Sequence, residues 1–233
     1  ILKNCKINNN SSSLNGGGIS INLKSYHSGF WNLGECMFFN NSSSNYGGGI
    51  RSYLNPFASA SWSLNNCVFI NNTAGDKGGG VSSDSFYSEN WSNSWDLTNC
   101  IFYANSAVRY GGGIFAHFNN AYDDNSISTI WSLRNCFLSK NYAGIEGGGL
   151  YSTSYSFTSP KSLILINSIL AKNISDEIQF HGLNSSLSWT SHALEEGVEA
   201  AYPGDPNAKD PVYQPNLNIL QGWEGDARAF DAD

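Results

Sequence analysis

The sequence is poor in charge, and it lacks the features that mark membrane-spanning helices and nucleic-acid-binding surfaces. Only 13% of the 233 residues are charged, the net charge is −7, and Lys and Arg form no cluster. This argues against a nucleic-acid partner. No run of about 18 apolar residues occurs, so we predict no transmembrane helix. No segment shows a 3.6-residue apolar period over ten residues, which excludes helical repeats.

The excess of acidic over basic residues is confined to one end of the chain. Residues 1–183 contain ten acidic and ten basic residues, whereas residues 184–233 contain nine acidic and two basic residues. The repeat described below also ends near this boundary. We therefore predict a repeat domain over 1–183 and an irregular C-terminal capping segment over 184–233, because the end of a repeat array needs covering.

An internal repeat dominates the first of these segments. Five cysteines follow one another at intervals of 31, 31, 33 and 36 residues. A Gly triplet begins eleven residues after each cysteine and is followed by an aliphatic residue, and an Asn stands five residues after each cysteine. A sixth unit has Ser168 in place of Cys and keeps Asn173. The cysteines are Cys5, Cys36, Cys67, Cys100 and Cys136.

Each repeat contains three short alternating runs separated by Gly and Asn corners. This pattern predicts an all-β fold, a right-handed parallel β-helix (solenoid) of about six coils, with equivalent residues stacked in columns. Leu, Cys and Phe/Ile columns face inward, Asn side chains stack into a ladder, and Gly forms corners. We expect the cysteines to be buried free thiols, since parallel Cβ vectors do not suit a disulfide. No His or second Cys stands at ligand spacing, so no metal site is predicted.

The beginning of the chain falls inside a repeat. Ile1 is neither an initiator Met nor part of a signal-peptide pattern, and the first repeat lacks the Trp-x-Leu run that precedes later cysteines. We therefore expect the sequence to be a piece of a longer protein.

Two motifs resemble those of known families. The Phe38–Asn41 motif and its equivalents, followed by Gly-Gly-Gly-aliphatic, resemble the repeats of polymorphic outer-membrane proteins. The segments Asn167–Leu170 and Tyr202–Asp205 are similar to the closing region of a wider group of secreted bacterial β-helix proteins. The resemblance implies an extracellular or cell-surface location and an adhesive role. The implied partner is a glycan or a surface protein of a host or neighbouring cell.

Only the arm between each Gly triplet and the next cysteine varies in length, and variable segments on a rigid scaffold often carry function. Alternation from the aliphatic residue places aromatic and polar side chains outward on this arm. If they are exposed, such side chains suit the binding of a sugar or protein surface. The alternative is that long arms fold back and bury them. The predicted binding residues are Arg51, Tyr53, Asp84, Phe86, Phe115, His117, Tyr151 and Tyr155.

No motif for catalysis emerges from the sequence. Acidic residues are sparse in 1–183, a nucleophile elbow is lacking, and no cofactor is predicted. We interpret the chain as a non-catalytic extracellular β-helix module for adhesion, display or carbohydrate/protein binding. The alternative is a polysaccharide lyase or hydrolase acting on an acidic polysaccharide, which requires three acids, or an acid with Lys or Arg, in one groove. An ice-binding face is a third possibility, although bulky aromatics interrupt its Ser/Asn rows.

Overall fold

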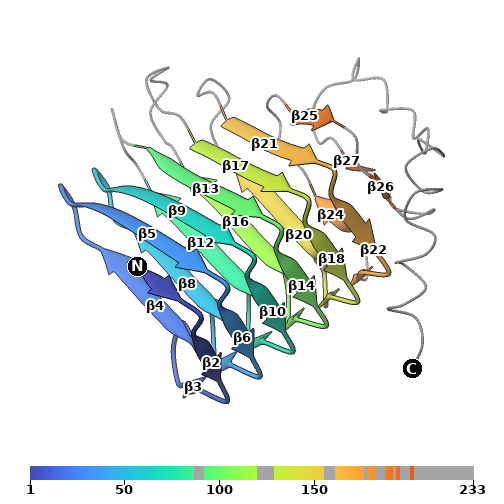
Figure 1. Cartoon of the computed structure of the whole chain (residues 1–233), viewed down its shortest axis with the longest axis horizontal. Helices are drawn as coiled ribbons and strands as arrows, with labels where there is room; N and C mark the ends of the chain where they lie inside the picture. Colours follow the sequence, from blue (N-terminus) through green and yellow to red (C-terminus); the bar gives the residue numbers. More distant parts are fainter. Residues whose placement is uncertain are drawn as a thin grey trace.

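The computed structural model shows a chain wound into a right-handed parallel β-helix (Figure 1). Four sheets run along the rod, and each coil contributes one strand to every sheet in turn. The structure describes residues 1–86, 92–119, 129–154, 161–175, 178–181, 187–190, 193–194 and 200–201.

The first two sheets each contain seven described strands. Sheet A consists of β1 (Leu2–Lys3), β5 (Ser28–Gly34), β9 (Ser59–Asn65), β13 (Asn93–Thr98), β17 (Thr129–Arg134), β21 (Lys161–Ile166) and β25 (Leu187–Thr190). Sheet B consists of β2 (Lys6–Asn8), β6 (Met37–Phe39), β10 (Val68–Ile70), β14 (Ile101–Tyr103), β18 (Phe137–Ser139), β22 (Ile169–Ala171) and β26 (Ala193–Leu194).

The other two sheets complete each coil. Sheet C consists of β3 (Ser11–Ser12), β7 (Ser42–Ser43), β11 (Thr73–Ala74), β15 (Ser106–Ala107), β19 (Tyr142–Ala143) and β23 (Ile174–Ser175). Sheet D consists of β4 (Ile19–Leu23), β8 (Ile50–Leu54), β12 (Val81–Phe86), β16 (Ile114–Asn119), β20 (Glu146–Ser154), β24 (Ile178–His181) and β27 (Ala200–Ala201). In Figure 1 the strands β5, β9 and β13 of sheet A and β6, β10 and β14 of sheet B lie in front, and the strands β8, β12 and β16 of sheet D lie behind them.

The predicted fold class is confirmed, with one correction to the content of the repeat. Each coil has four strands, not three, because the two residues after the ladder Asn pair with their equivalents to form sheet C. A strand of two residues is too short to show an alternating pattern in the sequence. Its inward residue is small and buried, as in Ala74, Ala107 and Ala143.

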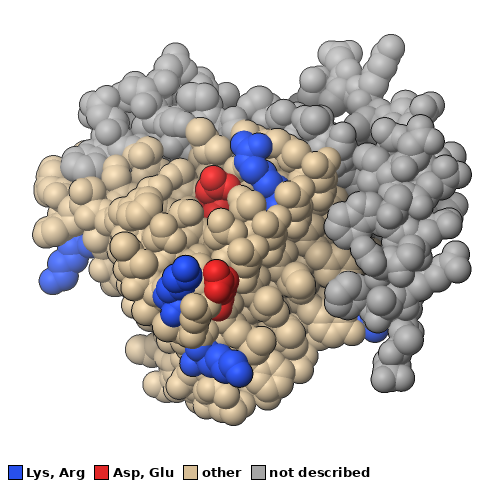
Figure 2. Space-filling view, in the orientation of Figure 1, with Lys and Arg blue, Asp and Glu red and all other residues tan. Residues whose placement is uncertain are grey.

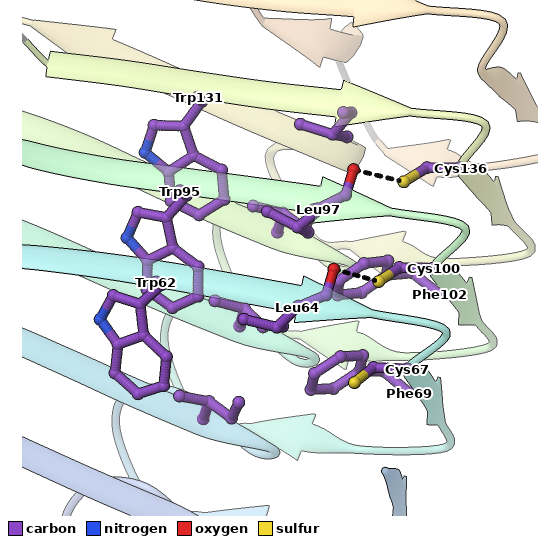
Figure 3. Close-up of a cluster of buried hydrophobic side chains, with 14 of the residues drawn as sticks. Trp62, Leu64, Cys67, Phe69, Trp95, Leu97, Cys100, Phe102, Trp131 and Cys136 are labelled. Atoms are coloured by element: carbon purple, nitrogen blue, oxygen red, sulfur yellow. Dashed lines mark hydrogen bonds between the residues drawn. The ribbon is translucent and has the colours of Figure 1, made fainter. Parts of the chain in front are cut away.

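The core is built from columns of identical or similar side chains (Figure 3). The rings of Trp62, Trp95 and Trp131 stack with centroids 4.6 and 4.7 Å apart, and Phe69 stacks on Phe102 at 4.6 Å. These side chains are 1% exposed or less. The coil repeat of about 4.8 Å thus brings equivalent rings into contact, which accounts for the same aromatic residue in successive repeats.

Indole nitrogens join sheet A to sheet D across this core. Trp62 Nε1 donates a hydrogen bond to Ser52 Oγ at 3.2 Å, and Trp95 Nε1 donates to Ser83 Oγ at 3.1 Å. In the next coil Ala116 takes the place of the serine, and the buried Trp131 Nε1 has no partner among the described residues. The indole N–H of Trp131 is therefore a buried donor without a partner, whereas the equivalent indoles of the two preceding coils are hydrogen-bonded.

The predicted Asn ladder is buried and satisfied. The amide N–H and Nδ2 of Asn72 both donate to Asn105 Oδ1, at 3.0 and 2.9 Å, and Nδ2 also donates to the Phe38 carbonyl at 3.0 Å. Asn72 Oδ1 in turn accepts two hydrogen bonds from Asn41. The same pattern continues through Asn141 to Asn173. Every coil is thus held to the next in one register.

The Gly triplets make corners, as predicted, and also permit close approach of neighbouring coils. Gly78 has φ +68°, a left-handed conformation that favours glycine. A Cβ on Gly79 would lie 2.4 Å from the carbonyl oxygens of both Gly112 and Ser106. The second glycine is therefore required because the backbone of the next coil occupies the space of a side chain.

The cysteines are all free thiols, as predicted, and Cys36, Cys67, Cys100 and Cys136 are buried whereas Cys5 is half-buried. Figure 3 shows Cys67, Cys100 and Cys136 as one inward column. Cys100 Sγ donates to the Leu64 carbonyl of the preceding coil at 3.5 Å, and Cys136 Sγ donates to Leu97 at 3.3 Å (Figure 3). The hydroxyl of Ser168 makes the equivalent bond to Leu133 at 3.1 Å. A serine can therefore replace the cysteine because both residues donate to the same carbonyl position.

Beyond residue 183 the structure describes three further strands. These are β25, β26 and β27, which extend sheets A, B and D. The remaining residues of the predicted capping segment 184–233 lie outside the described residues, so its irregular character stays a prediction. The described part of the chain contains no helix of the length and apolarity needed to cross a membrane.

The Asn ladder gives a direct test of coil-to-coil register. We expect Asn72→Ala to lower the free energy of unfolding by about 3 kcal/mol or more, because the buried backbone N–H and Nδ2 of Asn41 lose their shared acceptor and the Phe38 carbonyl loses a donor. Urea unfolding followed by circular dichroism measures the change. Asn71→Gly is the control: its side chain is exposed and its φ of 53° suits glycine. An Asn72→Ala variant as stable as this control would contradict the role of the ladder.

The unpaired indole predicts a stabilising substitution. Ala116→Ser should supply Trp131 Nε1 with the acceptor that Ser52 and Ser83 supply in earlier coils, and should raise the free energy of unfolding by about 1 kcal/mol. The melting temperature should rise by about 2 to 4 °C. Ser152→Ala is the matched control, since the buried Ser152 hydroxyl has no partner among the described residues. A lower melting temperature for Ala116→Ser would refute this account.

Candidate functional site

The predicted binding residues lie on the outer side of sheet D. Along β8, Ile50, Ser52 and Leu54 point into the core, so Arg51 and Tyr53 point outward. Parallel pairing then aligns residues of successive coils. Tyr53, Asp84 and His117 form one outward column, and Arg51, Ser82, Phe115 and Tyr151 form the adjacent one. The predicted columns are therefore confirmed.

A buried charge cluster joins the two columns. Asp84 forms an ion pair with Arg51, and its other carboxylate oxygen lies 3.0 Å from His117 Nδ1. A carboxylate only accepts hydrogen bonds, so Nδ1 carries the proton. The side chains of Arg51, Asp84 and His117 are 4%, 7% and 11% exposed. The opposite charges of Arg51 and Asp84 are thus removed from water together, which makes their burial tolerable.

The environment of Asp84 favours its charged form. Burial acts to raise the pKa of Asp84, but the hydrogen bond from His117 and the positive charges of Arg51 and Lys77 outweigh it. The net effect is a pKa below the ordinary value for an aspartate. Asp84 is therefore ionised at neutral pH and serves as the anionic centre of the cluster.

Aromatic rings surround these charges. The Arg51 guanidinium lies 4.8 Å from the ring centroid of Tyr46 and 5.2 Å from that of Tyr53. Phe115 stacks on Tyr151 at 5.4 Å. Cation–π contacts of this kind hold a guanidinium in one orientation. We call this group of residues the tyrosine-lined face: Tyr46, Arg51, Tyr53, Lys77, Asp84, Tyr110, Phe115, His117 and Tyr151.

Exposure and burial were the two alternatives for these side chains, and three of them are buried. Arg51, Asp84 and Phe115 are only 4%, 5% and 1% exposed. They are buried because aromatic and cationic side chains lie against them: Tyr46 contacts Arg51, and the Lys77 ammonium lies 4.9 Å from the Phe115 ring centroid. Tyr53, His117 and Tyr151 remain partly exposed.

Two predicted residues are not placed by the structure. Phe86 is the last residue of β12, but its side chain lies outside the described set, and Tyr155 lies outside the described residues altogether. Their membership of the tyrosine-lined face stays a prediction.

Three residues of the face were not predicted. Tyr46, Lys77 and Tyr110 pair with one another through isolated bridges in successive coils. Each stands immediately before a Gly triplet, ten residues after a cysteine. This fixed position was a usable signal, because residues at a constant distance from the cysteine stack in one column.

A second ion pair borders the face. Arg109 binds Asp76 through both Nε and Nη2, and the Nη2–Oδ2 distance is 2.7 Å. Asp76 is largely buried, whereas Arg109 is exposed. Within the described parts of the chain, no three His, Cys, Asp or Glu side chains gather as a metal site. The chemistry available here is that of paired charges and tyrosine hydroxyls.

The opposite side of the rod has a different character. Figure 2 shows the side that carries sheets A and B, where the described Lys, Arg, Asp and Glu side chains are few and scattered over a mostly uncharged surface. The ion pairs described above belong to sheet D and the corner before it. The tyrosine-lined face differs from this side in combining a buried ion pair with several aromatic rings.

Comparison with known proteins identifies the type of repeat. The fold and its columns define a parallel β-solenoid, and two segments match the model of the Chlamydia polymorphic membrane protein repeat, at residues 35–53 and 66–84. Comparison with curated proteins and with solved structures gave no match. The predicted resemblance to polymorphic outer-membrane protein repeats is thus confirmed, and this family suggests a protein of the outer membrane or cell surface.

Each matched segment includes part of the tyrosine-lined face. The first runs from Glu35 to Tyr53 and contains Tyr46 and Arg51, and the second runs from Asn66 to Asp84 and contains Lys77. Both start at the corner before sheet B and end on sheet D. The face is therefore built partly from the repeat itself and not only from the variable arms.

The charge cluster predicts a pH-dependent stability. Because the pKa of Asp84 is lowered in the folded protein, its contribution is present at neutral pH and is lost as pH falls through that lowered value. Asp84→Asn leaves Arg51 buried without its counter-charge, so it should cost about 3 kcal/mol or more at pH 7. The cost should shrink below about pH 4.

Thermal unfolding of both proteins between pH 3 and pH 8 measures this difference. Asp96→Asn is the control, because Asp96 is an exposed carboxylate on β13. A cost for Asp84→Asn that is the same at all pH values would show that the ionised carboxylate is not what stabilises the cluster.

Proposed function

We propose that the chain is an extracellular or cell-surface β-helix module that binds a glycan or a protein, without catalysis, through the tyrosine-lined face. The supporting observation is the arrangement of four half-buried tyrosines around a buried charge cluster, namely Tyr46, Tyr53, Tyr110 and Tyr151. The role of the module is then to display this face on a rigid rod and to adhere to other molecules through it.

Tyrosine is well suited to such a surface. Its ring presents a large apolar area with only two rotatable side-chain bonds, and its hydroxyl donates and accepts hydrogen bonds. Here the rings are further restricted, because Arg51 lies between Tyr46 and Tyr53, and Tyr110 packs against Tyr151 with centroids 4.9 Å apart. A ligand would therefore meet side chains that lose little conformational entropy on binding.

The buried charges act as supports in this proposal. Both carboxylate oxygens of Asp84 are engaged by protein groups, and Arg51 also donates to the Ser52 carbonyl at 3.1 Å. These contacts leave the pair poorly placed to bind a ligand directly. We assign Arg51 and Asp84 the role of holding the tyrosines in place.

One observation favours a second candidate function. A carboxylate, a guanidinium and an imidazole converge at Asp84, Arg51 and His117, which is the combination that a polysaccharide lyase or hydrolase would use. Binding is the better supported function because Asp84 is buried and already paired. Incubation with polyuronates, followed by absorbance of unsaturated products, distinguishes the two candidates.

The tyrosines provide the test of the binding proposal. Tyr53→Ala and Tyr110→Ala should each weaken binding about tenfold to ligands found on a glycan array or among surface proteins, because each removes a ring from the contact area. The melting temperature should change by less than about 4 °C. Tyr142→Ala is the control, since Tyr142 is 44% exposed and belongs to sheet C. Normal binding by both variants with a large fall in melting temperature would mean that these rings are structural.

A further inference from the structure

Lys77 stands at the centre of the tyrosine-lined face. Its ammonium nitrogen lies 5.8 Å from the ring centroid of Tyr46 and 5.7 Å from that of Tyr110, the equivalent residues of the coils before and after. The Phe115 ring lies beneath it at 4.9 Å. Three rings therefore hold one ammonium group in a defined place, and the residue remains partly exposed.

Lys77 differs from its charged neighbours in how its charge is balanced. Arg51 is paired with Asp84, and Arg109 is paired with Asp76. Among the described residues, Lys77 forms no salt bridge: its charge acts on Asp84 from a greater distance, and its close contacts are with ring faces. The two acids closest in sequence to it are thus already engaged by arginines.

We propose that Lys77 is the anchor for the carboxylate of an acidic sugar, with the neighbouring sugar rings lying against Tyr46 and Tyr110. This inference rests on the proposed function and names the ligand class of the same face. An ammonium flanked on both sides by tyrosine matches a saccharide in which a charged unit is flanked by uncharged ones. The apolar floor of Phe115 keeps the site partly dry, which strengthens a charge-assisted hydrogen bond.

The geometry also explains why an acidic sugar suits the site better than a simple anion. A small anion would satisfy the ammonium but leave the two tyrosine rings without contact. A sugar ring offers C–H groups to the ring faces and hydroxyls to the tyrosine oxygens. Affinity should therefore depend on both the carboxylate and the rings beside it.

The experiment uses hyaluronan oligosaccharides, which alternate a carboxylated and an uncharged sugar, and the same oligosaccharides after chemical reduction of the carboxylates. Titration calorimetry should show that the wild-type chain binds the acidic form about tenfold or more tightly than the reduced form. The preference should decrease as salt is raised. Lys77→Met should abolish the preference, and Lys77→Arg should retain most of it.

Lys140→Met is the matched control. Lys140 also places its ammonium near a tyrosine, 5.4 Å from the Tyr103 ring, but on sheet B. This variant should bind like the wild type. A Lys77→Met variant that keeps the preference would overturn the proposal. The proposal would also be overturned if inorganic phosphate and free glucuronate displaced the oligosaccharide equally well.

The outcomes separate this inference from the function on which it rests. The wild-type chain could bind uncharged glycans or a protein, lose that binding in Tyr53→Ala, and show no preference for carboxylated ligands. This result would overturn the role of Lys77 and leave the proposed function standing. Absence of any ligand whose binding depends on the tyrosines would overturn both.

Discussion

The amide ladder through Asn41, Asn72, Asn105, Asn141 and Asn173 is the interaction on which the rest of the structure depends. Each member is buried and passes its hydrogen bonds to the next coil, so a shift of one coil by a single residue would leave several buried amides without partners. This cost fixes the register between coils. Stacking of the Trp and Phe columns, the thiol hydrogen bonds and the alignment of outward side chains all follow from that register.

The same register makes a charged outer face possible. Arg51 meets Asp84 because the two lie one coil apart in adjacent columns, and His117 meets Asp84 one coil further on. A single coil could not provide both a charge and its partner at these positions. The rings of Tyr46 and Tyr110 likewise enclose Lys77 only because the three residues are stacked in successive coils. The face is therefore a property of several coils together.

Much of this organisation follows from the sequence, and the departures have physical causes. Constant spacing from Cys to Gly determines the columns, so the fold, the buried thiols and the outward alignment of Tyr53, Asp84 and His117 could be predicted. The burial of Phe115 was one of two alternatives that the sequence left open, because alternation shows on which side of a strand a residue lies but not which side chains cover it. Sheet C was missed because its strands have two residues, and Lys77 because a residue before a corner belongs to no alternating run.

The glycine column limits how such a chain can evolve. A Cβ on Gly79 would collide with the carbonyl of Gly112 in the next coil, and Gly48 and Gly112 are confined in the same way. A single-residue insertion between a cysteine and its ladder Asn would shift that Asn out of the amide ladder. It would also bring the residue before the triplet, such as Lys77, into the left-handed position of the first glycine. Duplication of an entire coil preserves every contact. We therefore expect such repeat proteins to gain or lose whole repeats during evolution, while the arms between sheets D and A tolerate insertions and deletions of single residues.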